Sequence, residues 1–492
     1  MPFVKKIVIL GGGTSGLVTA LILKKSNPLL DIHLIKSDEI DIVGVGEGST
    51  EHWATFMNYV GIHPIEIFKK TDATFKYGIK FNNWNGDGKS YMHAVTAEVM
   101  KETAIAHPYL YHKLIVDNED PNEVIDKFIQ NSQHYQPVGF SSNQYHFDTF
   151  KLNQFLQDKC IAHNINIITD TIIDVIVNDS GIVELKGNAG KYAADFFVDC
   201  SGFRKVLMNQ LDAEWVDCTE YLPMNSAMTF ATPYIEDEEL PSYTSATALS
   251  SGWVFRLPTQ QRFGNGYIYC DKFITEEQAL AEVEAHYGHK LQIGKRFKFG
   301  AGYLKKSWIK NCVGLGLAGS FIEPLEATSI GTSIQQAFVL ATYIQSWSKD
   351  TTGISEIYND QFEKVFKNIV DFVQLHYITK RDDSDFWKYC KTLKLTEFNE
   401  KTLPIFKNNL PGSPVFTNPY ILFRNYNWIL ILNGLELFNR QRLIEQWDNT
   451  FEHVRLEASV KLFLNQSKND NDIPLGHKDA INFILGLENA DN

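Results

Sequence analysis

Four glycines near the N-terminus have the spacing of a turn that binds the phosphates of a dinucleotide. An apolar, β-branched run at residues 7–10 precedes them, and an apolar helical pattern begins at Leu17. This order predicts a strand, a tight turn and a helix. Gly11 permits the turn, Gly13 lets the backbone approach a diphosphate, and Gly16 lets the helix pack closely on the strand, while the helix N-terminus offers free N–H groups. The predicted cofactor-binding residues of this motif are Gly11, Gly12, Gly13, Thr14, Ser15 and Gly16.

The second predicted strand, at residues 32–35, lacks the acidic residue that often holds a ribose 2′-hydroxyl. Lys36 and Ser37 stand in its place. The motif alone therefore does not distinguish NAD from FAD, and a glycine-rich turn without any dinucleotide is the simpler alternative for so short a pattern. A second glycine-rich segment, at residues 38–53, is either a surface turn or a strap whose backbone lies against the cofactor.

Composition excludes several classes of partner. The chain has 492 residues and 44% hydrophobic content, enough for two or three domain-sized units. Its formal net charge of −13 argues against nucleic acid and anionic membrane surfaces as partners. The six cysteines show no CxxC spacing, so neither a metal site nor a disulfide framework is indicated. With no apolar segment long enough to span a membrane, we expect a cytoplasmic protein.

One strand carries two lysines on the same face. Residues 72–84 alternate in the manner of a strand, with Phe75 and Tyr77 on one parity and Lys76 and Lys80 on the other. A half-buried strand is the simple interpretation of this pattern.

The middle of the chain returns to the first sheet by way of an inserted β-meander. We expect a helix at 149–162 and strands near 165–168, 171–177, 182–186 and 195–199, the last ending in Cys-Ser-Gly-Phe-Arg. This order is typical of FAD-dependent hydroxylase-type proteins, which favours FAD over NAD.

The remainder predicts a second sheet and a helical end. Residues 224–310 are rich in aromatic and β-branched residues with few helix signals, which predicts an antiparallel sheet on the substrate side. A strand near 313, a small-residue loop and a helix from Thr332 would present N–H groups to a flavin ring or an anion. The predicted fold is α/β (α+β), with an FAD-binding Rossmann-like core of the aromatic-hydroxylase type, the antiparallel sheet and a helical C-terminal part. The predicted segments are FAD-binding core at 1–90, 146–222 and 311–345, a substrate-region insertion at 91–145, the substrate-side sheet at 223–310 and a helical substrate-capping region at 346–492.

Six ordered motifs resemble the flavin-dependent tryptophan halogenase family along nearly the whole chain. They are GGGTSG, GVGEGST, FKYGIKFNNW, DCSGFR, EPLEAT and HYITKRDDSDFW. The resemblance implies an enzyme that uses FADH2, O2 and chloride, bromide or iodide to make hypohalous acid, which halogenates an electron-rich arene of the indole or phenol type. It also implies a separate flavin reductase as partner, because the chain has no second dinucleotide motif for a nicotinamide. The oligomeric state stays open, a homo-oligomer included.

The resemblance assigns roles to individual residues. Lys76 would hold the hypohalous acid or form a haloamine with it, and Glu326 would be the carboxylate beside it. Thr328 and Ser329 would bind halide, although Ser329 replaces a family glycine and Ala327 a family serine, so the preferred halide stays open. The flavin contacts that the resemblance implies are Gly12, Thr14, Ser15, Lys36, Ile40, Glu47, Gly48, Ile172, Leu317 and Ile330.

The predicted substrate region departs from the family. The family's WxWxIP reads WVFRLP here, with Phe255 in place of the second tryptophan. Val95 replaces a phenylalanine, and Trp428 with Ile429 replaces two tyrosines. We therefore expect small aromatics without an amino-acid backbone as substrates, and the softer halides in preference to chloride. The alternatives are an aromatic hydroxylase and a non-catalytic flavoprotein. The candidate substrate residues are His93, Val95, Trp253, Phe255 and Trp428.

Overall fold

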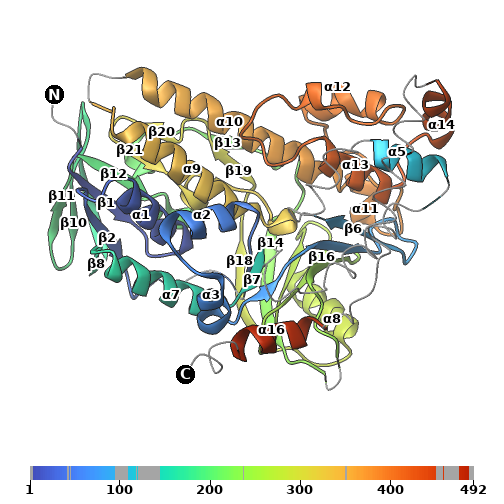
Figure 1. Cartoon of the computed structure of the whole chain (residues 1–492), viewed down its shortest axis with the longest axis horizontal. Helices are drawn as coiled ribbons and strands as arrows, with labels where there is room; N and C mark the ends of the chain where they lie inside the picture. The colour runs from blue at the N-terminus through green and yellow to red at the C-terminus, as the bar shows by residue number, and fades with distance from the viewer. Residues whose placement is uncertain are drawn as a thin grey trace. The chain divides into compact units, whose positions relative to one another are not determined.

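Contacts in the computed structural model group the chain into two compact units, each with its own sheet and core (Figure 1). Unit 1 comprises Met1–Ala73, Phe147–Thr219 and Gly300–Lys367, and unit 2 comprises Thr74–His146, Glu220–Phe299 and Asn368–Asn492. The structure describes residues 4–40, 44, 46–94, 109–117, 119, 144–235, 238–348, 352–449, 458 and 476–486.

Unit 1 is built on a six-stranded sheet in the order β20-β21-β12-β1-β2-β8. The strands are β1 (Lys6–Leu10), β2 (Asp31–Lys36), β8 (Asn166–Thr169), β12 (Phe196–Asp199), β20 (Trp308–Ile309) and β21 (Cys312–Gly314). All neighbouring pairs are parallel except β20 with β21. The Rossmann-like core that the sequence predicts is therefore confirmed.

Helices cover one face of this sheet. In Figure 1, α1 (Thr14–Ser26), α7 (Thr149–Ala162) and α9 (Thr328–Ile344) lie along it, and α1 contacts both of the others. The helix expected at 149–162 is confirmed, because Asp148 caps it by accepting bonds from the N–H groups of Phe150 and Lys151. The helix expected from Thr332 begins earlier, at Thr328. Two shorter helices, α2 (His52–Val60) and α3 (Pro64–Thr71), follow the glycine-rich strap.

The predicted β-meander packs on the other face. It consists of β9 (Ile172–Asn178), β10 (Gly181–Gly187) and β11 (Lys191–Ala193), all antiparallel. Ile182 and Leu185 of the meander share one apolar core with Val8, Leu10 and Phe197 of the sheet. A small sheet of β13 (Trp215–Asp217), β19 (Gly302–Leu304) and β22 (Ser320–Phe321) also belongs to this unit.

Unit 2 is built on a seven-stranded sheet in the order β18-β14-β17-β16-β15-β5-β6. The strands are β5 (Gly78–Asn82), β6 (Ser90–Ala94), β14 (Ser226–Thr232), β15 (Tyr243–Ala248), β16 (Gly252–Pro258), β17 (Phe263–Tyr269) and β18 (Ile293–Lys298). The sheet is antiparallel as expected, apart from one parallel pair, β15 with β5. Through this pairing residues 74–90, which the sequence places in the first core segment, cluster with unit 2. The finer division into six segments stays a prediction.

A helix in the middle of unit 2 was not expected. The structure has α8 (Glu276–Tyr287), whose Ala279 and Val283 cover Met228 and Tyr267 of the sheet. The sequence did carry the signal, because Thr275 and Gln278 form a capping box and Gly288 ends the helix in a left-handed conformation. Aromatic and β-branched content on either side masked this local pattern.

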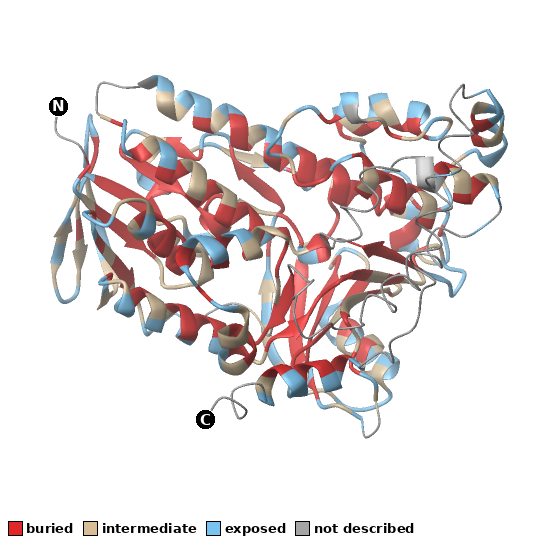
Figure 2. Ribbon diagram, viewed as in Figure 1, coloured by how far each residue is buried: buried red, intermediate tan, exposed pale blue. Residues whose placement is uncertain are grey.

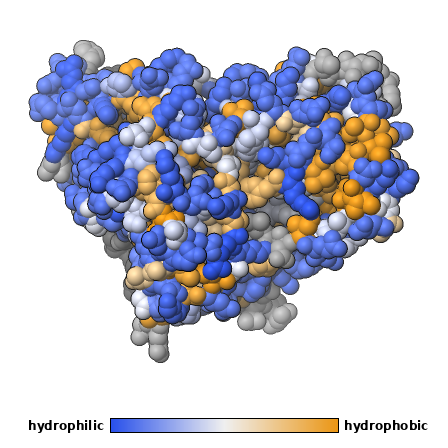
Figure 3. Space-filling view, turned by 180° about the vertical axis from the view of Figure 1, so that it is seen from behind, coloured by the Kyte–Doolittle hydropathy of each residue, from blue (hydrophilic) through white to orange (hydrophobic). Residues whose placement is uncertain are grey.

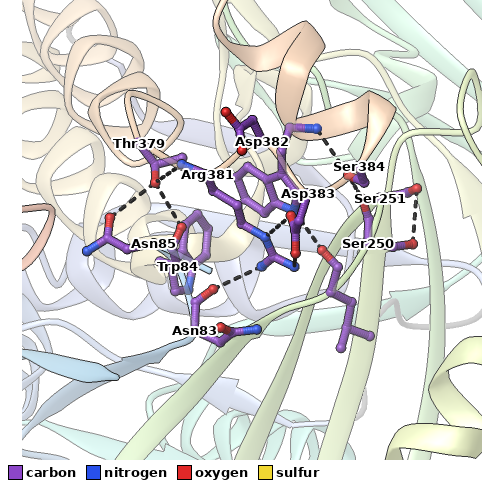
Figure 4. A network of polar contacts seen from close by, with 12 residues as sticks. Asn83, Trp84, Asn85, Ser250, Ser251, Thr379, Arg381, Asp382, Asp383 and Ser384 are labelled. Atoms are coloured by element: carbon purple, nitrogen blue, oxygen red, sulfur yellow. Dashed lines mark hydrogen bonds and ion pairs between the residues drawn. The ribbon is translucent and has the colours of Figure 1, made fainter. Parts of the chain in front are cut away.

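Helices form much of the C-terminal part, as predicted. They are α10 (Thr352–Leu375), α11 (Asp385–Cys390), α12 (Glu397–Phe406), α13 (Asn425–Gly434), α14 (Arg440–Asp448) and α16 (His477–Gly486), together with α5 (Tyr109–Val116) from the insertion. The segment after α10 is fixed by Arg381, which donates to both carboxylate oxygens of Asp383 at 2.6 and 3.0 Å and to the carbonyl oxygen of Asn83 at 2.9 Å (Figure 4). Its guanidinium also lies over the ring of Trp387, 4.8 Å from the centroid.

The distribution of side chains is that of a folded, charged protein. Buried residues gather along the strands and on the helix faces that cover them (Figure 2), and the face in Figure 3 is mostly hydrophilic between hydrophobic patches. No helix within the described residues has both the length and the apolar character of a membrane span. All six cysteines are free, and the described part of the chain holds no cluster of His, Cys, Asp and Glu that could bind a metal ion.

The glycine turn of unit 1 leads to a stability prediction. A methyl group at Gly16 would collide with the carbonyl oxygen of Gly11, whereas one at Gly13 would meet no heavy atom within 4 Å. We expect Gly16→Ala to lower the free energy of unfolding by about 3 kcal/mol, because α1 must move away from the turn. Gly13→Ala, the matched control, should change it by less than about 1 kcal/mol. Urea denaturation followed by circular dichroism measures both, and equal stability of the two variants would contradict the assigned packing.

Candidate functional site

The glycine turn of unit 1 has the features of a phosphate site. Gly11 has φ of +126°, which only glycine adopts readily. Gly13 is the N-cap of α1, no side chain caps the helix, and its first turn holds no acidic residue, so the N–H groups and the positive end of the helix dipole face open space. Asn153 of α7 holds the turn from behind by donating to the carbonyl oxygen of Gly12 at 2.8 Å. These residues fit the diphosphate of a dinucleotide.

Several other predicted flavin contacts gather around this turn. The hydroxyl of Thr14 donates to the Glu47 carboxylate at 3.1 Å, and the side chain of Lys36 lies where a methyl group on Gly12 would meet it at 2.6 Å. The carbonyl oxygen of Lys36 accepts from the N–H of Asp170 at 2.9 Å, and Ile172 begins β9 two residues after Asp170. Ile40 is 48% exposed.

The start of α9 also contacts the turn. The hydroxyls of Ser15 and Ser333 lie 2.9 Å apart, and Ser333 donates to the carbonyl oxygen of Ser329 at 2.8 Å. Gly316 begins a short 3-10 turn, η3 (Gly316–Ala318), with φ of +60°, and a side chain there would collide with Ser15. The structure therefore brings Ser15, Leu317 of η3 and Ser329 into one region of unit 1. The sequence showed no motif for Asn153 or Ser333, so their parts were missed.

The strap connects the turn to α9. Glu47 and Gly48 form the short strand β3 (Glu47–Gly48) beside Thr14, and at the far end of the strap the side chain of Thr50 fills the space against Gly331. His52 links the same two segments, because its Nε2 lies 2.7 Å from the amide nitrogen of Gln335. Of the two interpretations of residues 38–53, a strap held against the cofactor-binding residues is the one that these contacts favour.

The predicted halide segment is a helix N-terminus without a side-chain cap. Glu326 ends the 3-10 turn η4 (Pro324–Glu326) and is 4% exposed, and Thr328 and Ser329 begin α9. Ala327 between them has φ of +53°, a conformation that costs a non-glycine residue about 1 kcal/mol or more and that concentrates at functional sites. Uncapped N–H groups at the start of a helix suit a small anion such as a halide.

In unit 2, Lys76 lies at a break between two strands. The single strand expected at 72–84 is wrong in this detail: β4 (Thr74–Phe75) ends before Lys76, and β5 begins at Gly78. The physical reason is a change of backbone partner, since the N–H of Lys76 donates to Gln144 at 3.1 Å and the N–H of Tyr77 donates to Ser242 at 2.7 Å. The Lys76 side chain is 1% exposed.

A neutral histidine lies close to this lysine. His146, on β7 (Tyr145–Phe147), pairs with Thr74 of β4. The hydroxyl of Thr74 donates to the carbonyl oxygen of Pro258 at 2.9 Å, so it accepts from Nδ1 of His146 at 3.0 Å, while Nε2 accepts from Thr244 at 2.9 Å. Burial, and then the positive charge of Lys76, hold the pKa of His146 well below its usual range. No motif in the sequence pointed to this histidine.

The described candidate substrate residues are mostly buried in aromatic surroundings. Ring centroids of His93 and Trp428 lie 5.4 and 5.6 Å from that of Phe372, and Nε2 of His93 lies 2.9 Å from the amide nitrogen of Asn427. Three more rings surround Trp428, those of Phe398, Phe406 and Phe416.

The two aromatic residues of WVFRLP lie elsewhere in unit 2. Trp253 donates from Nε1 to the hydroxyl of Tyr377 at 3.1 Å, and half-buried Phe255 covers Gly266 on the next strand. Val95 lies outside the described residues.

A parallel sheet with a glycine turn, an inserted meander and a second antiparallel sheet define an FAD-binding protein of the Rossmann-like class. The particular family follows from comparison, because the family model for tryptophan halogenase matches residues 6–448 and the chain belongs to that family. It is an FADH2-dependent halogenase, an oxidoreductase that uses O2 and a halide. Enzymes of this family depend on a separate flavin reductase and act on small aromatic substrates.

Individual relatives are similar over nearly their whole length. The chain is 28% identical to the tryptophan 6-halogenase ThaL of Streptomyces albogriseolus, covering 89% of this chain and 91% of the relative. It is also 28% identical to the tryptophan 7-halogenase RebH of Lentzea aerocolonigenes, covering 88% and 90%. A flavin-dependent halogenase from Xanthomonas campestris shares 25% identity at a TM-score of 0.82, covering 98% of this chain and 99% of that one. The fold is also that of a tryptophan halogenase from Shewanella frigidimarina, at a TM-score of 0.85, 22% identity and 98% coverage of both chains.

The environment of Glu47 gives a pH-dependent prediction. Removal from solvent raises the pKa of Glu47 from 4.5 to about 7, against the smaller opposing effect of its bond from Thr14. A raised pKa in the folded state means that the contribution of this group to stability is fully present below pH 4.5 and is lost as the pH rises through 7. Glu47→Gln should therefore be more stable than wild type at pH 8 by roughly 1–3 kcal/mol, with the difference closing toward pH 4.5.

Denaturation of the flavin-free protein across this pH range measures the effect. Thr14→Val removes the bond that lowers the pKa, so its loss of stability should shift to higher pH than in wild type. Identical pH profiles for wild type and Glu47→Gln would contradict the assigned environment.

Proposed function

We propose that this halogenase acts on a small electron-rich aromatic of the indole or phenol type that lacks an amino-acid backbone, with Lys76 and Glu326 as catalytic residues. The burial of Lys76 is the observation that supports its role most directly. A lysine that is 1% exposed is rare without a specific reason. Lys80, four residues further on, is half-buried and lies 5.4 Å from the centroid of the Tyr243 ring, as a structural lysine does.

The neutral histidine beside Lys76 supports a charged lysine as the donor. Both ring nitrogens of His146 form hydrogen bonds, one with Thr74 and one with Thr244, and its lowered pKa keeps the ring neutral. His146 therefore adds no second positive charge to the site. The ammonium of Lys76 can then donate to the oxygen of hypohalous acid and make the halogen more electrophilic. The haloamine alternative, in which the amine first takes up the halogen, gives the same requirement for Lys76.

The proposed reaction balances with two residues of this chain. When bound, FADH2 would supply two electrons to O2 and the halide would supply two more, so that O2 is reduced and halide is oxidised, giving water and hypohalous acid. The aromatic carbon takes the halogen, the departing oxygen takes a proton from Lys76 and leaves as water, and the carboxylate of Glu326 takes the proton that the ring loses. Lys76 then regains a proton from solvent and Glu326 releases its proton to solvent, which restores both groups.

The proposed preference for simple arenes rests on α13. Trp428 and Ile429 are both fully buried there, and Nε1 of Trp428 has no hydrogen-bond partner among the described residues. A site that grips an ammonium and a carboxylate needs polar groups at matched positions, and it rejects analogues that leave those groups unpaired. Two apolar residues at the positions of the family's tyrosines remove two such groups.

A lysine pair tests the catalytic assignment. With a flavin reductase, NADH and FAD, we expect Lys76→Ala to lower halogenated product by about a hundredfold or more, because the group that activates the oxidant is gone. FAD binding and NADH consumption by the reductase should not change, and Lys80→Ala should keep most of the activity. Mass spectrometry detects the product by its halogen isotope pattern. An active Lys76→Ala with an inactive Lys80→Ala would show that the strand is assigned wrongly.

A substrate and halide panel tests the specificity. We expect kcat/KM for indoles and phenols with bromide or iodide to exceed that for tryptophan with chloride, because bromide and iodide are easier to oxidise and the altered 327–329 segment need not be tuned to chloride. The protein incubated with NADH and FAD but without reductase is the control and should consume little NADH. A higher kcat/KM for tryptophan with chloride would contradict the proposed preference and point to tryptophan, the substrate in the names of its relatives.

A further inference from the structure

We propose that His477, on the C-terminal helix α16, is a positioning residue for Lys76: its imidazole holds the backbone immediately before the lysine. The proposal rests on the catalytic role of Lys76 given above. It concerns a part of the chain that the family match does not cover, since that match ends at residue 448.

The imidazole bridges two chain segments, one at Phe75 and one at residues 240–241. Nε2 of His477 accepts a hydrogen bond from the N–H of Phe75 at 3.1 Å. Nδ1 lies 3.2 Å from the carbonyl oxygens of both Leu240 and Pro241, to which it donates. Burial lowers the pKa of His477 to about 4, so the neutral ring carries one donor and one acceptor, as both contacts require.

The place of this bridge explains its importance. The parallel ladder between β5 and β15 starts at the pair Gly78 and Tyr243, and Tyr77 still reaches Ser242. Two residues before Tyr77, the N–H of Phe75 bonds to His477, whose imidazole connects it to Leu240 and Pro241 and so adds one more rung to the ladder. Lys76 lies between the last bond of the ladder and this rung, so both sides of its backbone are fixed.

Packing holds the imidazole in this position. His477 is 1% exposed, and Ala480, Ile481 and Ile484 of α16 are buried as well. The ring of Phe75 lies 5.9 Å from that of His477, centroid to centroid. In Figure 1, α16 at the red end of the colour bar lies against the strands of unit 2. A helix more than four hundred residues away in the sequence thus contributes to the lysine's backbone geometry, with a separation of 402 residues between the bonded pair.

Loss of the rung should affect the fate of the oxidant. If the backbone before Lys76 moves, the ammonium no longer lies where hypohalous acid and arene meet, and small displacements of this kind are costly to catalysis. Hypohalous acid then escapes into solution. We therefore expect less halogenated product per FADH2 oxidised, and more oxidant captured by a thioether added to the solution.

Substituting His477 with glutamine or asparagine, whose amides differ in length, distinguishes the contact of Nε2 from that of Nδ1. The amide of His477→Gln reaches the position of Nε2 and can accept from Phe75, whereas that of His477→Asn reaches only the position of Nδ1. We expect His477→Gln to stay within about twofold of wild type in product per FADH2 oxidised, and His477→Asn to fall by about fivefold or more, with trapped oxidant rising to match. Amide hydrogen exchange at Phe75 should be faster in the asparagine variant.

Controls separate positioning from general stability and from the proposed function. Ile481→Ala weakens the packing of α16 without removing any hydrogen bond of His477. It should therefore lower the melting temperature and keep the halogenated product per FADH2 oxidised at the wild-type level. The inference would be overturned if His477→Asn formed as much halogenated product per FADH2 oxidised as wild type, or if this ratio fell equally in His477→Asn and Ile481→Ala. If His477→Asn does not fold, a fall in product per FADH2 oxidised well beyond twofold in His477→Gln overturns the inference instead. Lys76→Ala in the same assay tests the proposed function by itself, because retained product there would refute the role of Lys76 whatever His477 does.

Discussion

The change of backbone partner at Lys76 is the structural constraint on which the proposed role of this lysine depends. Lys76 bonds to Gln144 and Tyr77 bonds to Ser242, so the chain passes from one sheet to another within a single residue. A lysine inside a regular ladder would point to one face of one sheet. At the break it is buried, and Thr74 ties its strand to Pro258 at the end of the WVFRLP segment. The motif that sequence comparison associates with the substrate region is thus bonded to the strand that precedes the lysine.

Unit 1 follows a similar principle with glycine in place of a strand break. Gly11, Gly16 and Gly316 each allow a contact that a side chain would prevent, and the contacts join the glycine turn, η3 and α9. The hydroxyls of Ser15 and Ser333 then link these elements directly. Contacts that are in place before the cofactor binds lower the entropy lost on binding. The starts of α1 and α9 have no side-chain cap, so their N–H groups suit a diphosphate and a small anion, respectively.

Buried titratable groups in both units keep charge low, beside Lys76 in unit 2 and beside the glycine turn in unit 1. His146 and His477 are neutral because burial disfavours their charged forms, so neither adds a positive charge beside Lys76. In unit 1, the raised pKa of Glu47 lowers the negative charge close to the glycine turn at neutral pH. A diphosphate would otherwise be repelled by a fully ionised carboxylate beside it.

The sequence by itself determined the parts of this protein that local signals encode. The glycine turn, α7 over 149–162, the meander and the family motifs depend on caps, periodicity and spacing within a few residues, so they could be predicted. The helix α8 had such signals as well, although flanking strands obscured them. Only the tertiary structure decided the break at Lys76, the link between Ser15 and Ser333, and the rung that His477 supplies. Each of these joins positions that are far apart in the chain, and a hydrogen bond across 318 or 402 residues leaves no periodic trace in the sequence.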